Sequence, residues 1–323
     1  MIDVYVTTYN RAEMLKRTIK SILNQTYTDF KLTILDNCST DNTKEIVASF
    51  TDPRIFYHRQ EKNLGPLGNM NFGITASKNK YFVVFHDDDI MAPSMLEKEI
   101  DALEQNPDIC AVSCRTKAIQ MDDNLPKFEK SENSILKLIK YNNKFFAKSF
   151  INDRNVMMFP TIMYRTDFLR KHEIYLKPEA GPSCDVLICM DIEKAGGTLG
   201  IIEEQLAYYR GHEEQFSQRA RVDMVKCLYL YMSKDKYYRE ILDENKKGQN
   251  RTYKKLLFNE MCLYAGEKIS SNEWKSDMNS YKEVLNLSTV TKLYGIFVMN
   301  ICITISPVIK KLYAMIKNRR GKD

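Results

Sequence analysis

Tyr81-Phe82-Val83-Val84-Phe85-His86-Asp87-Asp88-Asp89 is the stretch that decides the fold of this chain. Five apolar residues, rich in valine and aromatic side chains, lead into one histidine and three consecutive carboxylates. Such a run predicts a strand that is buried on both faces. The strand should end where the acids begin, because aspartate is disfavoured inside strands. Since open α/β sheets bind ligands at the carboxyl ends of their strands, the stretch predicts a central strand that ends in a ligand site.

Three neighbouring carboxylates repel one another unless a cation or hydrogen-bond donors lie among them. A divalent metal with oxygen ligands, Mg²⁺ or Mn²⁺ carrying a bound phosphate, would relieve that repulsion. The alternative is an acidic loop that caps the helix expected after Pro93. We favour the metal because two other predicted strands also end in polar residues.

Strands and helices alternate on either side of this stretch. Further strands are predicted at 2–7, 32–35, 55–57, 109–113, 159–164 and 199–202, with helices between the first five strands along the chain. This order is typical of a mostly parallel sheet with helices on both faces. Thr8-Tyr9-Asn10-Arg11 follows the first strand and Asp36-Asn37 follows the second. In such a sheet both clusters meet Asp87-Asp88-Asp89 at one edge, which predicts a nucleotide pocket.

Composition narrows the class of protein. The chain has 323 residues, of which 44% are hydrophobic and 28% charged, as in a soluble globular protein. Its net charge of +6 is too modest for a dedicated nucleic-acid binder, and no basic patch interleaves with aromatic residues. Eight cysteines lack the spacing of metal sites and are expected to be reduced thiols of a cytoplasmic protein. The first residues read as a strand, so no targeting peptide is expected there.

Several motifs of this sequence resemble those of the inverting family 2 glycosyltransferases, which have the GT-A (Rossmann-like) fold. The likeness covers roughly 2–217. It rests on V-Y-V-T-T-Y-N-R at 4–11, D-N-C-S-T-D at 36–41, the glycine-punctuated loop at 63–73 and the three central acids, which are similar to the family's D-x-D element. The likeness implies an enzyme that moves a sugar from a nucleotide-diphospho-sugar donor to an acceptor hydroxyl, with Mn²⁺ or Mg²⁺ as cofactor.

The resemblance also assigns donor contacts. It implies that Tyr9 stacks on the base and that Asp87 lies beside the ribose. Asn37 stands where the family has a second acid, and Met70 stands where it has an arginine. The residues implied to bind the donor are Thr7, Thr8, Tyr9, Arg11, Asp36, Asn37, Asn63, Gly65, Asn71, Asp87 and Arg210.

By the same resemblance Asp88 is a metal ligand, with Asp89 and His212 as its candidate partners. The commonest family form has an acid where this chain has His86, which leaves the division of roles among the three aspartates open. Tyr208-Tyr209-Arg210-Gly211-His212 is similar to the family's tyrosine-arginine-x-histidine segment, which closes over the donor diphosphate. An arginine in that segment is suited to neutralising a leaving diphosphate.

Asp185 precedes the apolar helix face that begins at Val186. On position alone, an acid in the first turn of a helix is the better interpretation. The resemblance reverses this preference, because the family's catalytic base sits in such an acid-then-helix context. An inverting transfer needs one carboxylate to take the proton of the acceptor hydroxyl. Asp191 is a weaker rival, since it lies inside the helix.

The chain changes character after the transferase-like part, which gives two predicted domains, 1–220 and 221–323. The second is expected to be a helical appendage rich in Tyr, Leu and Lys. Its apolar run at 293–309 is short and interrupted for a spanning helix, and a basic segment follows it. An interfacial anchor on anionic headgroups fits this pattern, and a buried terminal helix is the alternative.

The predicted function is a metal-dependent, inverting glycosyltransferase. The resemblance implies that it is of the bacterial type that extends a surface polysaccharide, on a saccharide or lipid-linked acceptor. It is expected in the cytoplasm, at the inner face of the cell membrane. One alternative is a non-catalytic sugar-nucleotide or polysaccharide-binding protein. The other is a metal-dependent nucleotidyltransferase, against which the absence of a lysine-bearing glycine-rich loop near the N-terminus counts.

Overall fold

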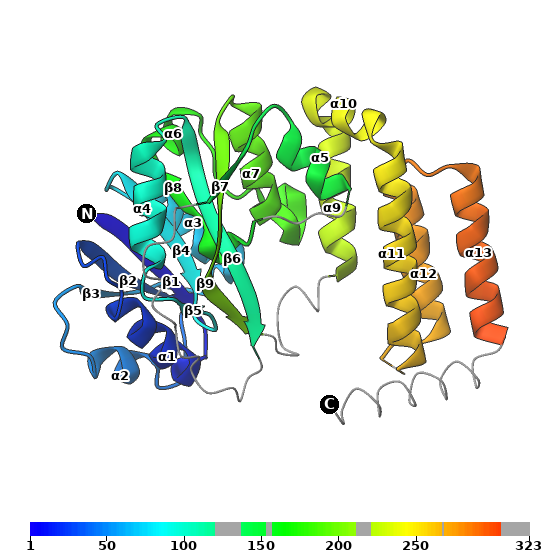
Figure 1. Cartoon of the computed structure of the whole chain (residues 1–323). Coiled ribbons are helices and arrows are strands. Elements are labelled where there is room, and N and C mark those ends of the chain that lie inside the picture. Colours follow the sequence, from blue (N-terminus) through cyan, green and yellow to red (C-terminus); the bar gives the residue numbers. More distant parts are fainter. Residues whose placement is uncertain (120–136, 153–156, 211–220, 267, 305–323) are drawn as a thin grey trace. The chain divides into compact units, whose positions relative to one another are not determined.

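The computed structural model describes residues 1–119, 137–152, 157–210, 221–266 and 268–304 (Figure 1). The chain divides into two compact units. The first comprises 1–146, 155–178 and 184–219, and the second comprises 147–154, 179–183 and 220–323.

The first unit is built on one mixed sheet (Figure 1). Its strands are β1 (Ile2–Thr8), β2 (Phe30–Asp36), β3 (Ile55–Arg59), β4 (Tyr81–His86), β5 (Ile90–Met91), β6 (Ile109–Ile119), β7 (Leu138–Tyr141), β8 (Met163–Arg165) and β9 (Thr198–Arg210). The order is β3-β2-β1-β4-β8-β6-β9-β5, and β7 also pairs with β9. The four strands from β3 to β4 are parallel, whereas β8 is antiparallel to both β4 and β6.

Strand β4 lies in the middle of this sheet, as predicted. Its residues from Tyr81 to Phe85 are almost completely buried, which a strand covered on both faces requires. Its register with β1 pairs Ile2 with Tyr81 and Thr7 with His86. The polar ends of β1, β2 and β4 therefore meet at one edge.

Helices cover both faces of the sheet (Figure 1). They are α1 (Ala12–Leu23), α2 (Thr43–Ala48), α3 (Gly65–Ala76), α4 (Met95–Gln105), α6 (Thr166–Lys171) and α7 (Cys184–Lys194), with a 3₁₀ turn at Phe159–Thr161. The short helix α5 (Phe145–Ile151) and the 3₁₀ turn at Pro178–Ser183 belong mostly to the second unit. Successive side chains of β1 point to opposite faces of the sheet. On one face, Val4 packs in a core with Leu15 of α1. Tyr5 instead meets α3, where Gly73 allows close approach of the two backbones.

Three predicted strands differ from the structure by more than two residues at one end. The strand expected at 159–164 begins with a 3₁₀ turn, and only Met163–Arg165 forms β8. The strand expected at 109–113 continues to Ile119, and the one expected at 199–202 extends to Arg210. These two strands pair with each other in parallel. The pairing holds residues in strand conformation although their own sequence pattern predicts a strand only weakly.

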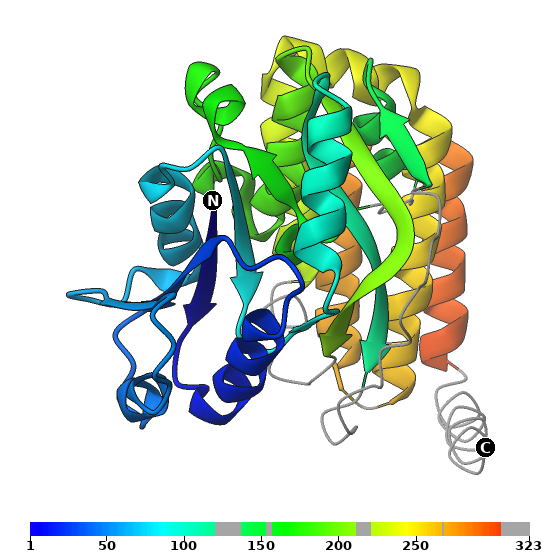
Figure 2. The same ribbon diagram turned by 60° about the vertical axis from the view of Figure 1, so that its left-hand side comes forward.

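The second unit consists of helices α9 (Arg221–Lys234), α10 (Lys236–Glu244), α11 (Lys246–Ala265), α12 (Ser271–Val284) and α13 (Thr289–Thr304). Figures 1 and 2 show α11, α12 and α13 side by side. Aromatic side chains form much of their core, among them Trp274, Tyr253 and Tyr281. Helix α13 packs through Thr291, Gly295, Met299 and Cys302. Gly295 lies so close to Tyr253 that an added Cβ atom would clash with its hydroxyl. Within the part of the chain that the structure describes, no helix is long and apolar enough to cross a bilayer.

Candidate functional site

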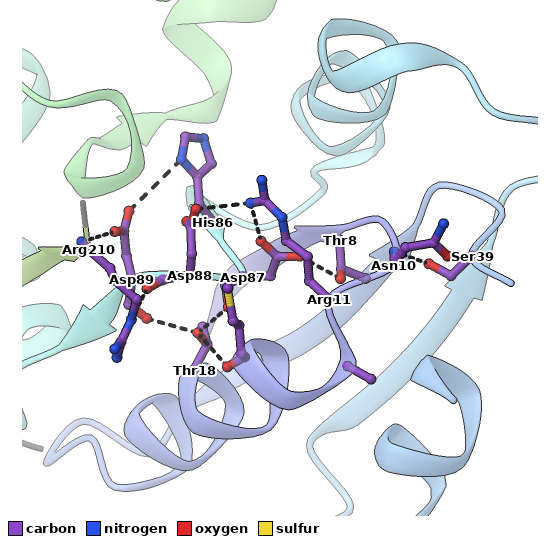
Figure 3. A network of polar contacts seen from close by, with 12 residues as sticks. Thr8, Asn10, Arg11, Thr18, Ser39, His86, Asp87, Asp88, Asp89 and Arg210 are labelled. Atoms are coloured by element: carbon purple, nitrogen blue, oxygen red, sulfur yellow. Dashed lines mark hydrogen bonds and ion pairs between the residues drawn. The ribbon is translucent and has the colours of Figure 1, made fainter. Parts of the chain in front are cut away.

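A turn at the end of β4 holds the three central aspartates (Figure 3). Thr18 of α1 donates its hydroxyl hydrogen bond toward the backbone carbonyls of Asp87 and Asp89, each at 2.8 Å. Thr18 lies on the buried stripe of α1 between apolar neighbours, and this placement is the signal that sequence reasoning missed. One buried hydroxyl therefore fixes the shape of the turn.

Asp87 points toward β1 and α1. Its carboxylate accepts a hydrogen bond from the Thr8 hydroxyl at 2.6 Å and lies 3.3 Å from Nη1 of Arg11. The same nitrogen of Arg11 is 2.9 Å from Oδ2 of Asp88. Burial, together with the charge of Asp88, raises the pKa of Asp87 to about 7. The site thus concentrates negative charge, which the guanidinium of Arg11 offsets only in part.

Asp89 lies on the other side of the turn. Its Oδ1 accepts a hydrogen bond from the backbone N–H of Arg210 at 3.1 Å, and Nε of Arg210 donates to the carbonyl of Asp88 at 3.1 Å. The end of β9 is thereby tied to the turn, which brings Arg210 to the acids. Burial and the charge of Asp88 raise the pKa of Asp89 well above its usual range.

His86, Asp88 and Asp89 present ligand atoms that all lie within 4.8 Å of one another. Nδ1 of His86 is 3.9 Å from Oδ2 of Asp89 (Figure 3). Among the described residues, neither this oxygen nor Nε2 of His86 has a hydrogen-bond partner, although both atoms are buried. Burial lowers the pKa of His86, which favours the neutral imidazole that binds metals. A buried carboxylate oxygen without a partner, close to an imidazole, fits a site for a divalent cation.

A second polar group lies at the end of β2. Asp36 is buried and accepts hydrogen bonds from the Tyr57 hydroxyl at 2.5 Å and the Ser39 N–H at 2.8 Å. Asn37 donates to Oδ1 of Asn63 at 2.8 Å and accepts from the backbone N–H of Leu64 at 2.8 Å. These bonds fasten the loop that begins α3 to the edge of the sheet.

Asn10, which follows β1, links the polar residues near the end of β4 to those at the end of β2. Its backbone has φ of 53°, a left-handed conformation that asparagine tolerates better than most residues. Its N–H donates to the Ser39 hydroxyl at 2.9 Å, and its side-chain oxygen accepts from the N–H of Thr40 at 2.7 Å. The neighbouring Tyr9 is left 45% exposed, so its ring is available to a ligand. The sequence pattern predicts Asn10 only as part of a polar turn and gives no sign of this role.

Two other predicted donor residues make hydrogen bonds within the protein. Both amide atoms of Asn71 bond to the backbone of Leu176, at 2.7 and 2.9 Å, and so hold the segment that leads toward α7. Gly65 has φ of 71°, and its N–H donates to Oδ1 of Asn63 at 2.8 Å, which shapes the start of α3. Thr7, the remaining donor residue on β1, lies opposite His86 in the register.

Asp185 lies in the first turn of α7 and accepts a hydrogen bond from the Val186 N–H at 2.8 Å. Burial raises the pKa of Asp185 to about 6. Within the described residues it shares no hydrogen bond or ion pair with the central acids. Its rival Asp191 is paired with Lys177 at 2.7 Å. His212 lies outside the described residues.

Sequence comparisons identify the family, and structure comparisons identify the fold. A family model described as Glycosyl transferase family 2 matches residues 3–171. The chain is 32% identical over 175 residues to an uncharacterised glycosyltransferase of Methanocaldococcus jannaschii, a match that covers 53% of this chain and 58% of that protein. It is 34% identical over 100 residues to the succinoglycan biosynthesis protein ExoO of Rhizobium meliloti, covering 31% of this chain and 29% of that protein. The matches therefore span little more than half of the first relative and under a third of the second.

Two solved structures show the same fold. S. aureus TarS 1-349 in complex with UDP superposes with a TM-score of 0.65 at 16% identity, over 97% of this chain and 91% of that one. The mannosyltransferase PcManGT from Pyrobaculum calidifontis, in complex with GDP-Man and Mn²⁺, gives a TM-score of 0.55 at 13% identity, over 100% of this chain and 88% of that one. Both likenesses place the first unit among GT-A folds.

Proposed function

The chain belongs to glycosyl transferase family 2, and we propose that it transfers a sugar, with inversion, from a nucleotide-diphospho-sugar to a hydroxyl of a growing surface polysaccharide. The observation that carries this proposal is the convergence of Asp87, Asp88 and Asp89 with Arg11 and Arg210 at the edge where β1, β2 and β4 end. A buried, acid-rich edge beside arginines suits a metal-bound diphosphate. The relative ExoO, a succinoglycan biosynthesis protein, supports a polysaccharide product.

The nucleoside would lie on the group that Asp36 and Asn37 form. The exposed ring of Tyr9 offers a stacking surface for the base, while the polar atoms of Asn37 and Asn63 hold the loop beneath it. The structural neighbours carry UDP in one case and GDP-Man in the other, which supports a nucleotide donor of either kind.

Asp88 and Asp89 would hold the divalent ion, with His212 as a further candidate. A bound Mn²⁺ or Mg²⁺ supplies charge that stabilises the leaving diphosphate. Arg210 is placed by its two hydrogen bonds to the turn, so its guanidinium stays near the same charge. Arg11 keeps Asp87 and Asp88 oriented toward the edge of the sheet.

Asp185 would be the general base. The acceptor oxygen attacks the anomeric carbon from the face opposite the diphosphate, and its proton passes to the Asp185 carboxylate. The bond from the anomeric carbon to the diphosphate oxygen breaks, and its electron pair leaves with the diphosphate. With a pKa of about 6, this carboxylate is ionised near neutral pH. A general base is most efficient when its pKa lies near the operating pH, and this value meets that condition.

A thermal-shift panel tests the donor site. UDP, GDP and dTDP, with their common sugars, would each be added with and without Mn²⁺, because binding to the folded state raises the unfolding midpoint. We expect one nucleotide to raise it only when metal is present, and Asp88→Asn to abolish that rise. Asp243→Asn, an exposed carboxylate of α10, is the matched control. A rise that Asp88→Asn leaves intact would refute the metal assignment.

Transfer itself needs a second assay. The donor that the panel identifies would be incubated with membrane extract as the acceptor source, and release of the nucleoside diphosphate would be measured. Release in the parent and none in Asp88→Asn supports the transferase. Donor that is bound but never consumed would favour a sugar-nucleotide-binding protein instead.

Helix α13 supports attachment to a membrane surface, where a lipid-linked acceptor would be found. Its outer stripe is apolar and exposed, at Val290, Leu293, Tyr294, Phe297 and Ile301. Nζ of Lys254 lies 5.5 Å from the ring centre of Tyr294, so the stripe is bordered by positive charge. The sequence beyond it adds Lys310, Lys311, Lys317, Arg319, Arg320 and Lys322. Apolar side chains beside basic ones fit the inner, anionic face of the cell membrane.

A further inference from the structure

We propose that His86 is a nitrogen ligand of the divalent ion, together with Asp88 and Asp89, and that it shifts the preference of the site from Mg²⁺ toward Mn²⁺. This proposal rests on the proposed function, because it concerns the ion that the donor diphosphate would bind. It adds a ligand that the resemblance did not supply, since the family has an acid at this position.

The turn after β4 places His86 and Asp89 face to face. They are the first and fourth residues of that turn, which brings their side chains to the same side. Asp87, between them, turns away to the hydroxyl of Thr8. Asp87 therefore faces β1. The side chains of His86, Asp88 and Asp89 point toward one common position, where a metal ion could bind.

The contacts around this centre hold its two outer members in place. Oδ1 of Asp89 is occupied by the N–H of Arg210, which leaves Oδ2 directed toward His86. The imidazole of His86 packs beside the ring of Phe159, with 5.9 Å between ring centres. Asp89 is only 2% exposed, yet its Oδ2 has no hydrogen-bond partner among the described residues. This buried oxygen lacks a partner, and a metal ion bound by both side chains would supply one.

The consequence is a change in ion preference. Mg²⁺ favours sites made only of oxygen atoms, whereas an imidazole nitrogen favours transition-metal ions. Replacing a family acid by His86 should therefore cost affinity for Mg²⁺ more than for Mn²⁺. A site whose ligands are all carboxylates should instead shift the preference toward Mg²⁺.

Pulsed electron paramagnetic resonance of bound Mn²⁺ detects the ligand directly. The full chain would be loaded with Mn²⁺ and UDP, or GDP if the thermal-shift panel selects it, and examined for nitrogen coupling. We expect ¹⁴N modulation that changes to the ¹⁵N pattern when histidine is ¹⁵N-labelled. It should vanish in His86→Asn and persist in the control His172→Asn, which alters an exposed histidine of the same unit. Modulation that vanishes only in His212→Asn would overturn the proposal and assign the nitrogen to His212.

Ion preference gives an independent measurement. In His86→Asn, affinity for Mn²⁺ in the presence of the nucleotide should fall roughly tenfold or more, while affinity for Mg²⁺ should change less than about threefold. His86→Asp restores an oxygen ligand and should bind Mg²⁺ more tightly than the parent does. Equal losses for both ions in His86→Asn, with no gain for Mg²⁺ in His86→Asp, would overturn the proposal. Mn²⁺ binding without any nitrogen coupling would likewise overturn it and leave the proposed function standing, whereas a chain that binds neither ion with nucleotide contradicts both.

Discussion

One guanidinium nitrogen of Arg11 lies 2.9 Å from Oδ2 of Asp88. The same nitrogen reaches Asp87 at 3.3 Å, so a single cation serves two buried carboxylates. A divalent ion on Asp88 would offset part of the same charge. Arg11 and the ion should therefore be partly redundant for the stability of the fold.

Arg11→Gln tests this redundancy. Without metal, the variant should lose roughly 2 kcal/mol of unfolding free energy, because the buried carboxylates lose their cation. With Mn²⁺ and the donor nucleotide the loss should shrink, and urea titrations under both conditions would measure it. Arg17→Gln, an exposed arginine of the same helix, is the control and should change stability little. An equal loss in both conditions would contradict the shared role.

Asp185→Asn should lower kcat by at least about a hundredfold while leaving the metal-dependent nucleotide shift intact, because a general base acts on the acceptor. Asp167→Asn is a matched control, since Asp167 is an exposed acid in the first turn of α6. If Asp185 is only a first-turn acid, the two variants will behave alike in steady-state kinetics.

The pH profile gives a second reading of Asp185. Burial raises the pKa of this carboxyl to about 6, and only its ionised form can accept the proton. We therefore expect kcat/KM to be level above pH 7 and to fall as the pH drops through 6, approaching tenfold per pH unit. A profile that stays level down to pH 5 would remove Asp185 from this role.

Glu99 of α4 is fully buried, and neither of its carboxylate oxygens has a hydrogen-bond partner among the described residues. Burial raises the pKa of Glu99 well above its ordinary value of 4.5. The folded state then holds a proton that the unfolded state releases above pH 4.5. Its contribution to stability is complete below that pH and declines as the pH rises toward the folded-state pKa.

Glu99→Gln removes this decline. The stability of the variant relative to the parent should rise between pH 5 and pH 7, by up to about 1.4 kcal/mol per pH unit, in urea titrations at several pH values. The other carboxyls with raised pKa values are present in both proteins, so their contributions cancel in the difference between the two unfolding free energies. Asp101→Asn, an exposed acid on the same helix, should give a difference that does not depend on pH in this way. A pH-independent difference for Glu99→Gln would show that this carboxyl is solvated.

The outer stripe of α13 should bind anionic vesicles. Leu293→Glu combined with Phe297→Glu places two acids on side chains that are 61% and 64% exposed, so the fold should be kept. Flotation with vesicles containing phosphatidylglycerol should recover the parent and leave the double variant behind. Ser276→Glu with Asn279→Glu, on the exposed side of α12, adds the same two charges and is the control. If a second copy of the chain covers the stripe instead, the variant will change the oligomeric state and not the flotation.

Much of the fold could be predicted because its main signal is local. The apolar run before Asp87 specifies a doubly covered strand, and the alternation of strands and helices specifies the layered sheet. The family and the GT-A fold predicted from these motifs are confirmed by the family model and the structural neighbours. Inversion, the metal and the acceptor stay predictions.

The boundaries near the site could not be read locally. The short strand β8 enters between β4 and β6 in the opposite direction, which depends on its pairing with both neighbours. Strand β9 runs on to Arg210 because β6 and β5 pair with its second half. No local pattern in the sequence encodes such pairings across many residues.

The sequence by itself determined that three acids end a buried strand and that two other strands end in polar residues, because burial and strand propensity act over a few neighbouring positions. Only the tertiary structure decided how those residues are used. It turned Asp87 toward Thr8, gave the amide of Asn71 to Leu176 and placed His86 opposite Asp89. Each of these outcomes depends on hydrogen bonds and packing between segments far apart in the chain, and satisfying buried polar groups is settled only when those segments meet.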